Sequence, residues 1–183
     1  MYDDIYLFID GEWRLASDNE TKAVTDPATE EQLGTIPVAT EADIDDALSA
    51  AERGFEVWRK MGTWERATII RKTADLIRER VDEVAIAMSL ETGKPLAEAK
   101  GETGAAADQF EWYSEETKRI YGQIIGSRTH DSRMAVIMQP VGVVAAFSAW
   151  NFPALLPARK IAAALGAGCS IIVKPSLIIN KWI

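Results

Sequence analysis

The segment "VVAAFSAWNFPALLPARKIAAALGAGCSIIVK", residues 143–174, decides the fold of this chain. It contains two short apolar runs, Val143–Ser148 and Ser170–Lys174, and between them a helix-like stretch, Pro153–Leu165. Short strands that flank a helix favour a parallel pair joined by a right-handed crossover. The segment therefore predicts a βαβ unit and places the chain in the α/β fold class.

Polar side chains follow both predicted strands. Asn151 lies just past the end of the first strand, and Lys174 ends the second. Ligands bind outside the carboxyl ends of the strands in open α/β sheets, so two polar residues at this edge suit a nucleotide or an oxyanion. The sequence has neither a GxGxxG nor a GxxxxGK[ST] phosphate-binding loop, so this pattern alone does not identify the ligand.

Further strands are predicted on both sides of a helical block. Asp10-Gly11 lies between two apolar runs in "YLFIDGEWRL" and predicts a hairpin. Leu33–Val38 is a second strand candidate in the same N-terminal block. After the helices, Met134–Gln139 alternates polar and apolar residues and predicts a strand with one face toward water.

The helical block occupies residues 41–120. Thr40 with Asp43 three residues later resembles a capping box, which marks the start of a helix. Gly93 is a plausible helix stop, and Pro95 suits the start of the next helix. Apolar residues at helical spacing predict helices over residues 44–58, 64–90 and 95–120.

Composition excludes several classes of protein. The chain has 183 residues, 48% of them hydrophobic, which suits one domain, or one and a part. A net charge of −8 without a Lys/Arg run excludes nucleic acid as a partner. The start is acidic and the longest apolar stretch, Ile161–Val173, is too short to span a bilayer, so we expect no signal peptide and no membrane partner. A single cysteine and no Cys/His cluster predict a cytoplasmic protein without a metal site.

Motifs across residues 6–176 resemble the NAD(P)-dependent aldehyde dehydrogenase superfamily. The strongest part, "PVGVVAAFSAWNFPALLPARKIAAALGAGCSIIVKPS", contains PxGV, WNFP, RK, an AAGC-like run and KPS at the family's spacing. "FIDGEWR", "ETGKP" and "FEWYSEETKRIYG" extend the resemblance, which is greatest to succinate-semialdehyde dehydrogenases. It implies the N-terminal part of an aldehyde-dehydrogenase-like fold: a hairpin, helices, and an incomplete Rossmann-like βαβ unit.

The resemblance implies a catalytic role for Asn151. In the family, a cysteine thiolate attacks the aldehyde, and the Asn of WNFP and a backbone N–H bind the oxyanion of the thiohemiacetal. Hydride then passes to the nicotinamide, and a Glu-activated water hydrolyses the thioester. Asn151 would be the oxyanion donor, because an amide donates a hydrogen bond without titrating. The alternative is that Asn151 caps the helix predicted from Pro153.

The resemblance also implies NAD or NADP as the cofactor. Lys174 matches the family lysine that reaches the adenosine ribose. Ser148, Trp150 and Ser176 fall in the segments that would bind the cofactor. The alternatives are a solvated lysine at a strand end for Lys174 and core packing for Ser148 and Trp150; for Trp150, core packing is compatible with the cofactor role.

The RK pair bears on the substrate. Arg159 and Lys160 are adjacent on a helix, so their side chains diverge by about 100° and cannot share one task. In semialdehyde-oxidising relatives the Arg of RK faces the substrate carboxylate, so Arg159 is the candidate for binding an acidic aldehyde such as succinic semialdehyde. Lys160 matches a lysine near the active site. The alternative for both is a basic pair that faces solvent.

The chain departs from the family in its catalytic groups. The family's nucleophilic Cys and general-base Glu belong to segments beyond residue 183, and Cys169 enters an apolar strand, where we expect it to be buried and inert. Leu177 stands where the family carries a polar residue, and the rest of the tail also differs. Residues 1–183 are therefore predicted to be a partial cofactor-binding domain without the catalytic domain, inactive alone.

A function of another class stays open. Relatives use the strand at about residues 131–140 in contacts between subunits, so the resemblance implies a homo-oligomer. A chain that keeps this strand but lacks the nucleophile could serve as a non-catalytic oligomerisation or binding module. The enzyme alternative instead requires a small-molecule aldehyde, carboxylate-bearing by the argument from Arg159.

Overall fold

The predicted βαβ unit is present in the computed structural model, which describes residues 4–176. Its two strands are parallel, and their register places Phe147 opposite Lys174. The helix begins later than predicted, because Pro153 and Ala154 form a turn before it. The unit consists of β7 (Val143–Phe147), α5 (Leu155–Ala167) and β8 (Ser170–Lys174).

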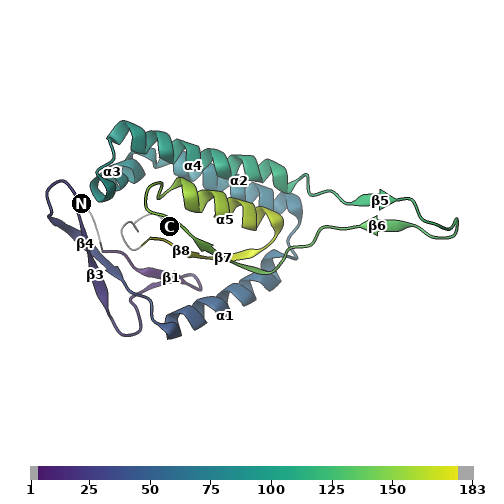
Figure 1. Cartoon of the computed structure of the whole chain (residues 1–183), viewed down its shortest axis with the longest axis horizontal. Coiled ribbons are helices and arrows are strands. Elements are labelled where there is room, and N and C mark those ends of the chain that lie inside the picture. The colour runs from purple at the N-terminus through teal and green to yellow at the C-terminus, as the bar shows by residue number, and fades with distance from the viewer. Residues whose placement is uncertain (1–3, 177–183) are drawn as a thin grey trace.

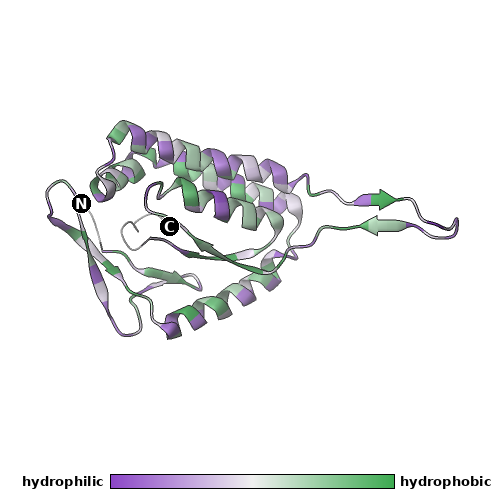
Figure 2. Cartoon of the chain, viewed as in Figure 1, coloured by the Kyte–Doolittle hydropathy of each residue, from purple (hydrophilic) through white to green (hydrophobic). Residues whose placement is uncertain are grey.

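The β7–β8 pair lies between helices (Figure 1). Helix α5 contacts the two strands from one side and α1 from the other, and α4 packs on both α5 and α2. Hydrophobic residues follow β7 and β8, whereas the outer helices carry residues of both kinds (Figure 2). Within residues 4–176, no helix is both long and apolar enough to cross a bilayer. The helices that surround α5 and the strand pair are α1 (Glu41–Trp58), α2 (Thr63–Glu79) and α4 (Leu96–Thr117).

Small side chains bring α5 close to its neighbours. The main core cluster takes two buried residues from each of α2, α4 and α5: Ile70, Ala74, Ala106, Phe110, Ala158 and Ala162. A Cβ atom added to Gly166 of α5 would lie 2.8 Å from the Thr117 hydroxyl of α4, so glycine is needed for this approach. The indole N–H of Trp58 donates to the Leu165 carbonyl at 2.8 Å and ties α1 to the end of α5. These contacts fix α5 against the rest of the fold.

The helix predicted over residues 64–90 is wrong in one respect, because it is two helices. α2 ends at Glu79, and α3 (Val81–Thr92) begins after Arg80, whose φ of −108° and ψ of 18° lie outside the helical region. The break lets α3 form a second core cluster with α4: Val84, Ala85, Met88 and Ala99. The predicted stop is confirmed, since Gly93 ends α3 with a φ of 70°.

Two antiparallel hairpins form the N-terminal part of the chain. The hairpin predicted at Asp10-Gly11 is confirmed, and both residues have positive φ, 54° and 83°. The strand predicted at Leu33–Val38 is present, but its partner was not predicted, because four of that partner's five residues are exposed and give little hydrophobic pattern. The strands are β1 (Leu7–Ile9), β2 (Glu12–Arg14), β3 (Thr21–Thr25) and β4 (Gln32–Pro37).

A two-stranded arm extends from the helices on one side of the molecule (Figure 1). It pairs β5 (Gln123–Ile125) with β6 (Met134–Val136) in antiparallel register. The strand predicted over Met134–Gln139 is shorter than expected. All three β6 residues are exposed, so the prediction of a single face toward water is also wrong, because nothing among residues 4–176 covers the arm.

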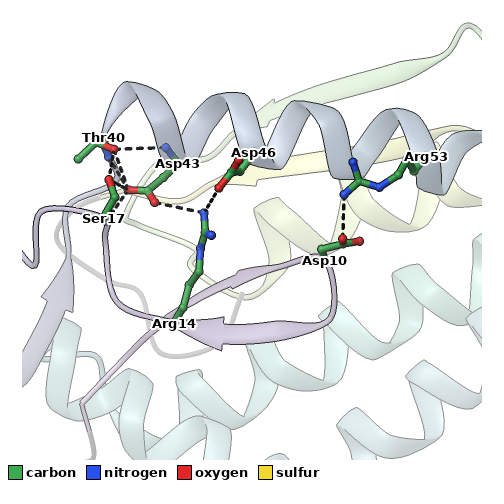
Figure 3. A network of polar contacts seen from close by, with 7 residues as sticks. All are labelled: Asp10, Arg14, Ser17, Thr40, Asp43, Asp46 and Arg53. Atoms are coloured by element: carbon green, nitrogen blue, oxygen red, sulfur yellow. Dashed lines mark hydrogen bonds and ion pairs between the residues drawn. The ribbon is translucent and has the colours of Figure 1, made fainter.

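A buried carboxylate joins the N-terminal hairpin to α1 (Figure 3). Asp43 Oδ2 accepts from the backbone N–H of Thr40 at 2.9 Å and of Ser17 at 3.1 Å, and Oδ1 lies 3.2 Å from Arg14 Nη2. The predicted capping box of Thr40 and Asp43 is confirmed. Burial alone would raise the pKa of Asp43, but hydrogen bonds from Thr40 and Ser17 favour the ionised form and lower it overall.

Cys169 is a core residue, as predicted. It lies between Gly168, which ends α5 with a φ of 91°, and the first residue of β8. Its side chain is buried, with a residue exposure of 3%. The Arg66 side chain packs over the neighbouring Gly168. A Cβ atom added to Gly168 would lie 3.4–3.6 Å from the guanidinium atoms of Arg66. The thiol therefore has no open path to an aldehyde in this arrangement.

We expect Asp43→Asn to reduce the free energy of unfolding by about 1–3 kcal/mol at neutral pH, because an amide cannot accept all these hydrogen bonds. The wild-type contribution is complete above the unfolded-state pKa of about 3.9 and is lost as the pH falls through the lower folded-state pKa. Urea unfolding between pH 7 and pH 3 measures both effects. Asp46→Asn is the control, since Asp46 contacts the same Arg14 at 2.8 Å but is 61% exposed. An equal loss in both variants would contradict the assignment.

We expect Cys169 to react with Ellman's reagent at least roughly a hundredfold more slowly in the folded chain than in urea, since the buried thiol reacts only after the structure opens. The control is Ser49→Cys in a Cys169→Ser background, because Ser49 lies exposed on α1. That thiol should react at similar rates with and without urea. Fast labelling of native Cys169 would show that it is accessible.

Candidate active site

The carboxyl edge of the β7–β8 pair brings two of the predicted cofactor residues together. The Ser148 N–H donates to the Lys174 carbonyl at 3.3 Å, which continues the ladder past the end of β7. The Ser148 hydroxyl is buried and has no hydrogen-bond partner among residues 4–176. Lys174 is exposed and Ser176 is half-buried. The edge thus has the exposed ammonium group of Lys174 and, behind it, the buried Ser148 hydroxyl without a partner among residues 4–176.

The turn between β7 and α5 carries Trp150 and Asn151. Trp150 is 58% exposed, so the alternative that it packs in the core is wrong for the described residues 4–176. Asn151 is also exposed, and within the same residues its side-chain amide makes no hydrogen bond. Pro153, two residues later, is buried and anchors the turn. The amide of Asn151 is therefore available to a ligand at this edge.

The start of α5 is capped by a residue that the sequence did not suggest. Glu102 of α4 accepts at Oε1 from the backbone N–H of Ala154 at 2.9 Å and of Leu155 at 3.2 Å. No side chain of the turn itself caps the helix. The alternative role of Asn151 as the cap of α5 is therefore wrong, because a carboxylate from another helix satisfies these N–H groups.

Lys94, in the loop between α3 and α4, contacts the same turn. Its ammonium forms an ion pair with Glu102 Oε2 and donates to the Asn151 carbonyl at 3.0 Å. It also lies 4.4 Å from the centre of the Phe152 ring. The Lys94 side chain is 15% exposed and that of Glu102 is 2% exposed. Lys94 belongs to the "ETGKP" motif, but the sequence does not identify its partner Glu102 or its contact with the turn.

An open pocket of about 400 Å³ lies beside the turn. Its wall is formed by the Lys94 loop, the turn, Glu98 of α4 and one residue of the β3–β4 connection, Pro27. The lining residues are Pro27, Glu91, Thr92, Gly93, Lys94, Pro95, Glu98, Trp150 and Asn151. Two of the predicted site residues, Trp150 and Asn151, therefore share one pocket.

The two basic residues of α5 diverge as predicted. Arg159 is exposed and forms no ion pair within the described part of the chain, residues 4–176. Lys160 is half-buried and donates to the Leu156 carbonyl of its own helix at 3.3 Å. Leu177 and the tail that follows lie outside the described residues. Residues 4–176 contain no group of three or more His, Cys, Asp or Glu side chains that could hold a metal.

The comparisons with known proteins agree on one family. The model of the aldehyde dehydrogenase family matches residues 13–178. The chain is 45% identical to a glutarate-semialdehyde dehydrogenase of Pseudomonas putida and 46% identical to an NADP-dependent succinate-semialdehyde dehydrogenase of Escherichia coli. Each match covers 92% of this chain but 35% of the relative, so the chain spans about a third of the length of these relatives.

Solved structures give the same result. The chain matches a crystal structure of an Escherichia coli NADP-dependent enzyme with a TM-score of 0.94 and 44% identity, over 96% of this chain and 36% of the other. It matches a succinate-semialdehyde dehydrogenase from Burkholderia pseudomallei with a TM-score of 0.92 and 44% identity, over 94% and 36%. The fold and the sequence agree over nearly the whole chain, and the chain belongs to the aldehyde dehydrogenase family.

Proposed function

We propose that this chain is the N-terminal part of an NAD(P)-dependent aldehyde dehydrogenase that oxidises an acidic semialdehyde. The observation that carries the proposal is the free amide of Asn151 at the carboxyl edge of the sheet, released from helix capping by Glu102. Relatives named for succinate and glutarate semialdehyde support this substrate class.

Asn151 acts as the oxyanion donor in this proposal. An aldehyde attacked by a thiolate develops negative charge on its oxygen, and a fixed N–H donor stabilises that charge without losing a proton itself. The side-chain amide is exposed, and the backbone that follows it is held by Lys94 at the Asn151 carbonyl and by buried Pro153. A donor fixed before the reaction needs little reorganisation, which is the condition for a large effect on rate.

The carboxyl edge fits a nicotinamide dinucleotide. We propose that Lys174, Ser148, Trp150 and Ser176 bind it, and the unpaired buried hydroxyl of Ser148 beside the Lys174 strand end supports this. When bound, NAD or NADP supplies the hydride acceptor. The ammonium of Lys174 would attract the anionic dinucleotide and donate hydrogen bonds to it.

Arg159 binds the substrate carboxylate in this proposal. It lies four residues into α5, about 6 Å along the axis from Leu155, and its guanidinium forms no ion pair among residues 4–176. Lys160 is held by its own helix and supports the site rather than the substrate. A guanidinium recognises a carboxylate through two parallel hydrogen bonds, so it favours acidic aldehydes over neutral ones.

The arm favours a second candidate function, an oligomerisation module. Ile124 is 78% exposed and Ile137 is 70% exposed, and Met138 beside it is 61% exposed. A projecting, apolar, two-stranded arm suits a contact with another copy of the chain, since its uncovered strand edges and side chains can pair with the same elements. We propose a homo-oligomer built through this arm, in the enzyme or in the module alone.

The substrate assignment predicts a selective effect of Arg159→Leu. We consider the enzyme completed by joining the C-terminal part of a succinate-semialdehyde dehydrogenase after Ser176. Losing a charge-assisted contact of about 1.5–3 kcal/mol should lower kcat/KM for succinic semialdehyde by roughly ten- to a hundredfold. A neutral aldehyde of similar length should lose little, because it never makes this contact. NAD(P)H formation measures both rates.

Three controls accompany this test. Asn151→Ala should slow both aldehydes alike, by roughly 10²–10³. Arg53→Leu, which removes an exposed guanidinium paired with Asp10, should slow neither. The 183-residue chain alone should show no turnover, because its single thiol, Cys169, is buried. Equal losses for both aldehydes in Arg159→Leu would make Arg159 structural and leave the aldehyde unspecified.

If the arm joins copies of the chain, the protein should self-associate in a concentration-dependent way, and two charges introduced on the arm should abolish this association. In the double variant Ile124→Lys and Ile137→Lys, sedimentation velocity should show a smaller particle than for wild type, because burying two lysines at the contact is unfavourable. Ile44→Lys on α1 is the control, since Ile44 is 52% exposed but lies off the arm. The same sedimentation coefficient for wild type and the arm variant would exclude the arm as the contact.

A further inference from the structure

We propose that Lys94 and Glu102 are positioning residues for the Asn151 turn: their buried ion pair sets where the amide donor stands. The proposal rests on the oxyanion role proposed for Asn151. The contacts described do not bring either residue to the reacting atoms, since Lys94 contacts the Asn151 carbonyl and the Phe152 ring, and Glu102 contacts backbone N–H groups.

One ion pair contacts four residues of the turn and of the start of α5. Lys94 binds the Asn151 carbonyl and lies over the ring of Phe152, while Glu102 binds the N–H groups of Ala154 and Leu155. The carbonyl contact fixes the peptide plane that follows Asn151, and the two N–H contacts fix the start of α5. Only Phe152 and Pro153 lie between the fixed Asn151 carbonyl and the fixed Ala154 N–H, and proline restricts the backbone further. The position of the Asn151 Cα is therefore restricted as well.

The ion pair is itself anchored. Glu102 belongs to α4, whose neighbouring residues Thr103 and Ala106 are buried. The Lys94 N–H donates to the Thr92 hydroxyl at 3.0 Å, and its carbonyl accepts from the Ser89 hydroxyl at 2.7 Å. Both bonds lead to α3, so the lysine stem starts from a fixed backbone. The side chains of Lys94 and Glu102 therefore fix the position of the turn relative to the helical core.

The exposure of this pair separates it from the surface pairs of the chain. The two side chains are 15% and 2% exposed, whereas Lys100 of α4 and Asp82 of α3, paired at 2.7 Å, are 46% and 72% exposed. Removing one member of a buried pair leaves the other charge without its partner, so the turn should shift rather than merely lose a weak contact. Lys100→Met is thus a matched control for Lys94→Met.

Two variants test the Lys94 contact and the Glu102 contact with the turn separately. Lys94→Met keeps the aliphatic stem but removes the bond to the Asn151 carbonyl. Glu102→Gln keeps one oxygen for the N–H groups of Ala154 and Leu155, but turns an amide NH₂ toward the lysine, where donor faces donor. In the completed enzyme, we expect each to lower kcat by roughly ten- to a hundredfold, since a misplacement of about 1 Å can cost this much.

The KM for the aldehyde should stay the same, and acidic and neutral aldehydes should lose rate alike, because the defect lies in transition-state stabilisation. In an Asn151→Ala background, Lys94→Met should add no further loss, because it acts through Asn151. Lys100→Met should leave kcat at the wild-type value. If Lys94→Met lowers only the melting temperature, with kcat per folded enzyme unchanged, or if its effect adds fully to that of Asn151→Ala, the positioning role is overturned.

Unchanged activity of Asn151→Ala would show that the proposed oxyanion role is wrong. Hydrogen exchange, which does not depend on catalysis, tests the positioning role in that case too. Amide hydrogen exchange of a peptide that spans residues 149–156 should be at least roughly tenfold faster in Lys94→Met than in wild type or Lys100→Met. Exchange in the α2 peptides should not change, which excludes global unfolding. Equal protection of the turn in all three proteins would overturn the proposal whatever Asn151 does.

Discussion

Helix α5 begins without a capping side chain of its own, and the site depends on how its first N–H groups are satisfied. Glu102 supplies the acceptor from α4, and its negative charge also complements the positive end of the α5 dipole. Close packing through Ala158, Ala162 and Gly166 fixes the same helix against α4. The carboxyl edge of the sheet, the Asn151 turn and Arg159 are therefore placed by one helix whose start and flank are both set by α4.

Local rules in the sequence predict the elements that this helix organises. The βαβ unit, the capping box at Thr40 and the stop at Gly93 each follow from neighbouring residues. The break at Arg80 does not, because no glycine or proline marks it and the two helices on either side share a continuous apolar pattern. It results from tertiary packing, since α3 turns to pack on the first turns of α4. The exposed strand β3 lacks the alternation that would have identified it.

The sequence predicts which residues form the candidate site, but not the contacts of Glu102 and Lys94 that hold the Asn151 turn. An asparagine at the start of a helix suits both a cap and an oxyanion donor, so the sequence alone leaves two roles for Asn151. The contact that decides between them joins Glu102 to Ala154, 52 residues apart, and Lys94 to Asn151, 57 residues apart. Such pairs have no local signal, because they depend on how α4 and α5 meet in three dimensions.

The choice of glutamate at position 102 follows from the number of donors that converge there. One oxygen accepts from two backbone N–H groups, and the other faces an ammonium. A carboxylate has about four acceptor positions on its two oxygens, whereas an amide offers one oxygen and presents donors on the other side. A neutral cap within the turn, such as Asn151 itself, would satisfy the helix with its side-chain oxygen, but this bond would fix the amide on the helix and turn its NH₂ donor away from a ligand. Placing the cap on α4 satisfies α5, pairs Lys94, and leaves the Asn151 side chain free at the edge where the ligand is proposed to bind.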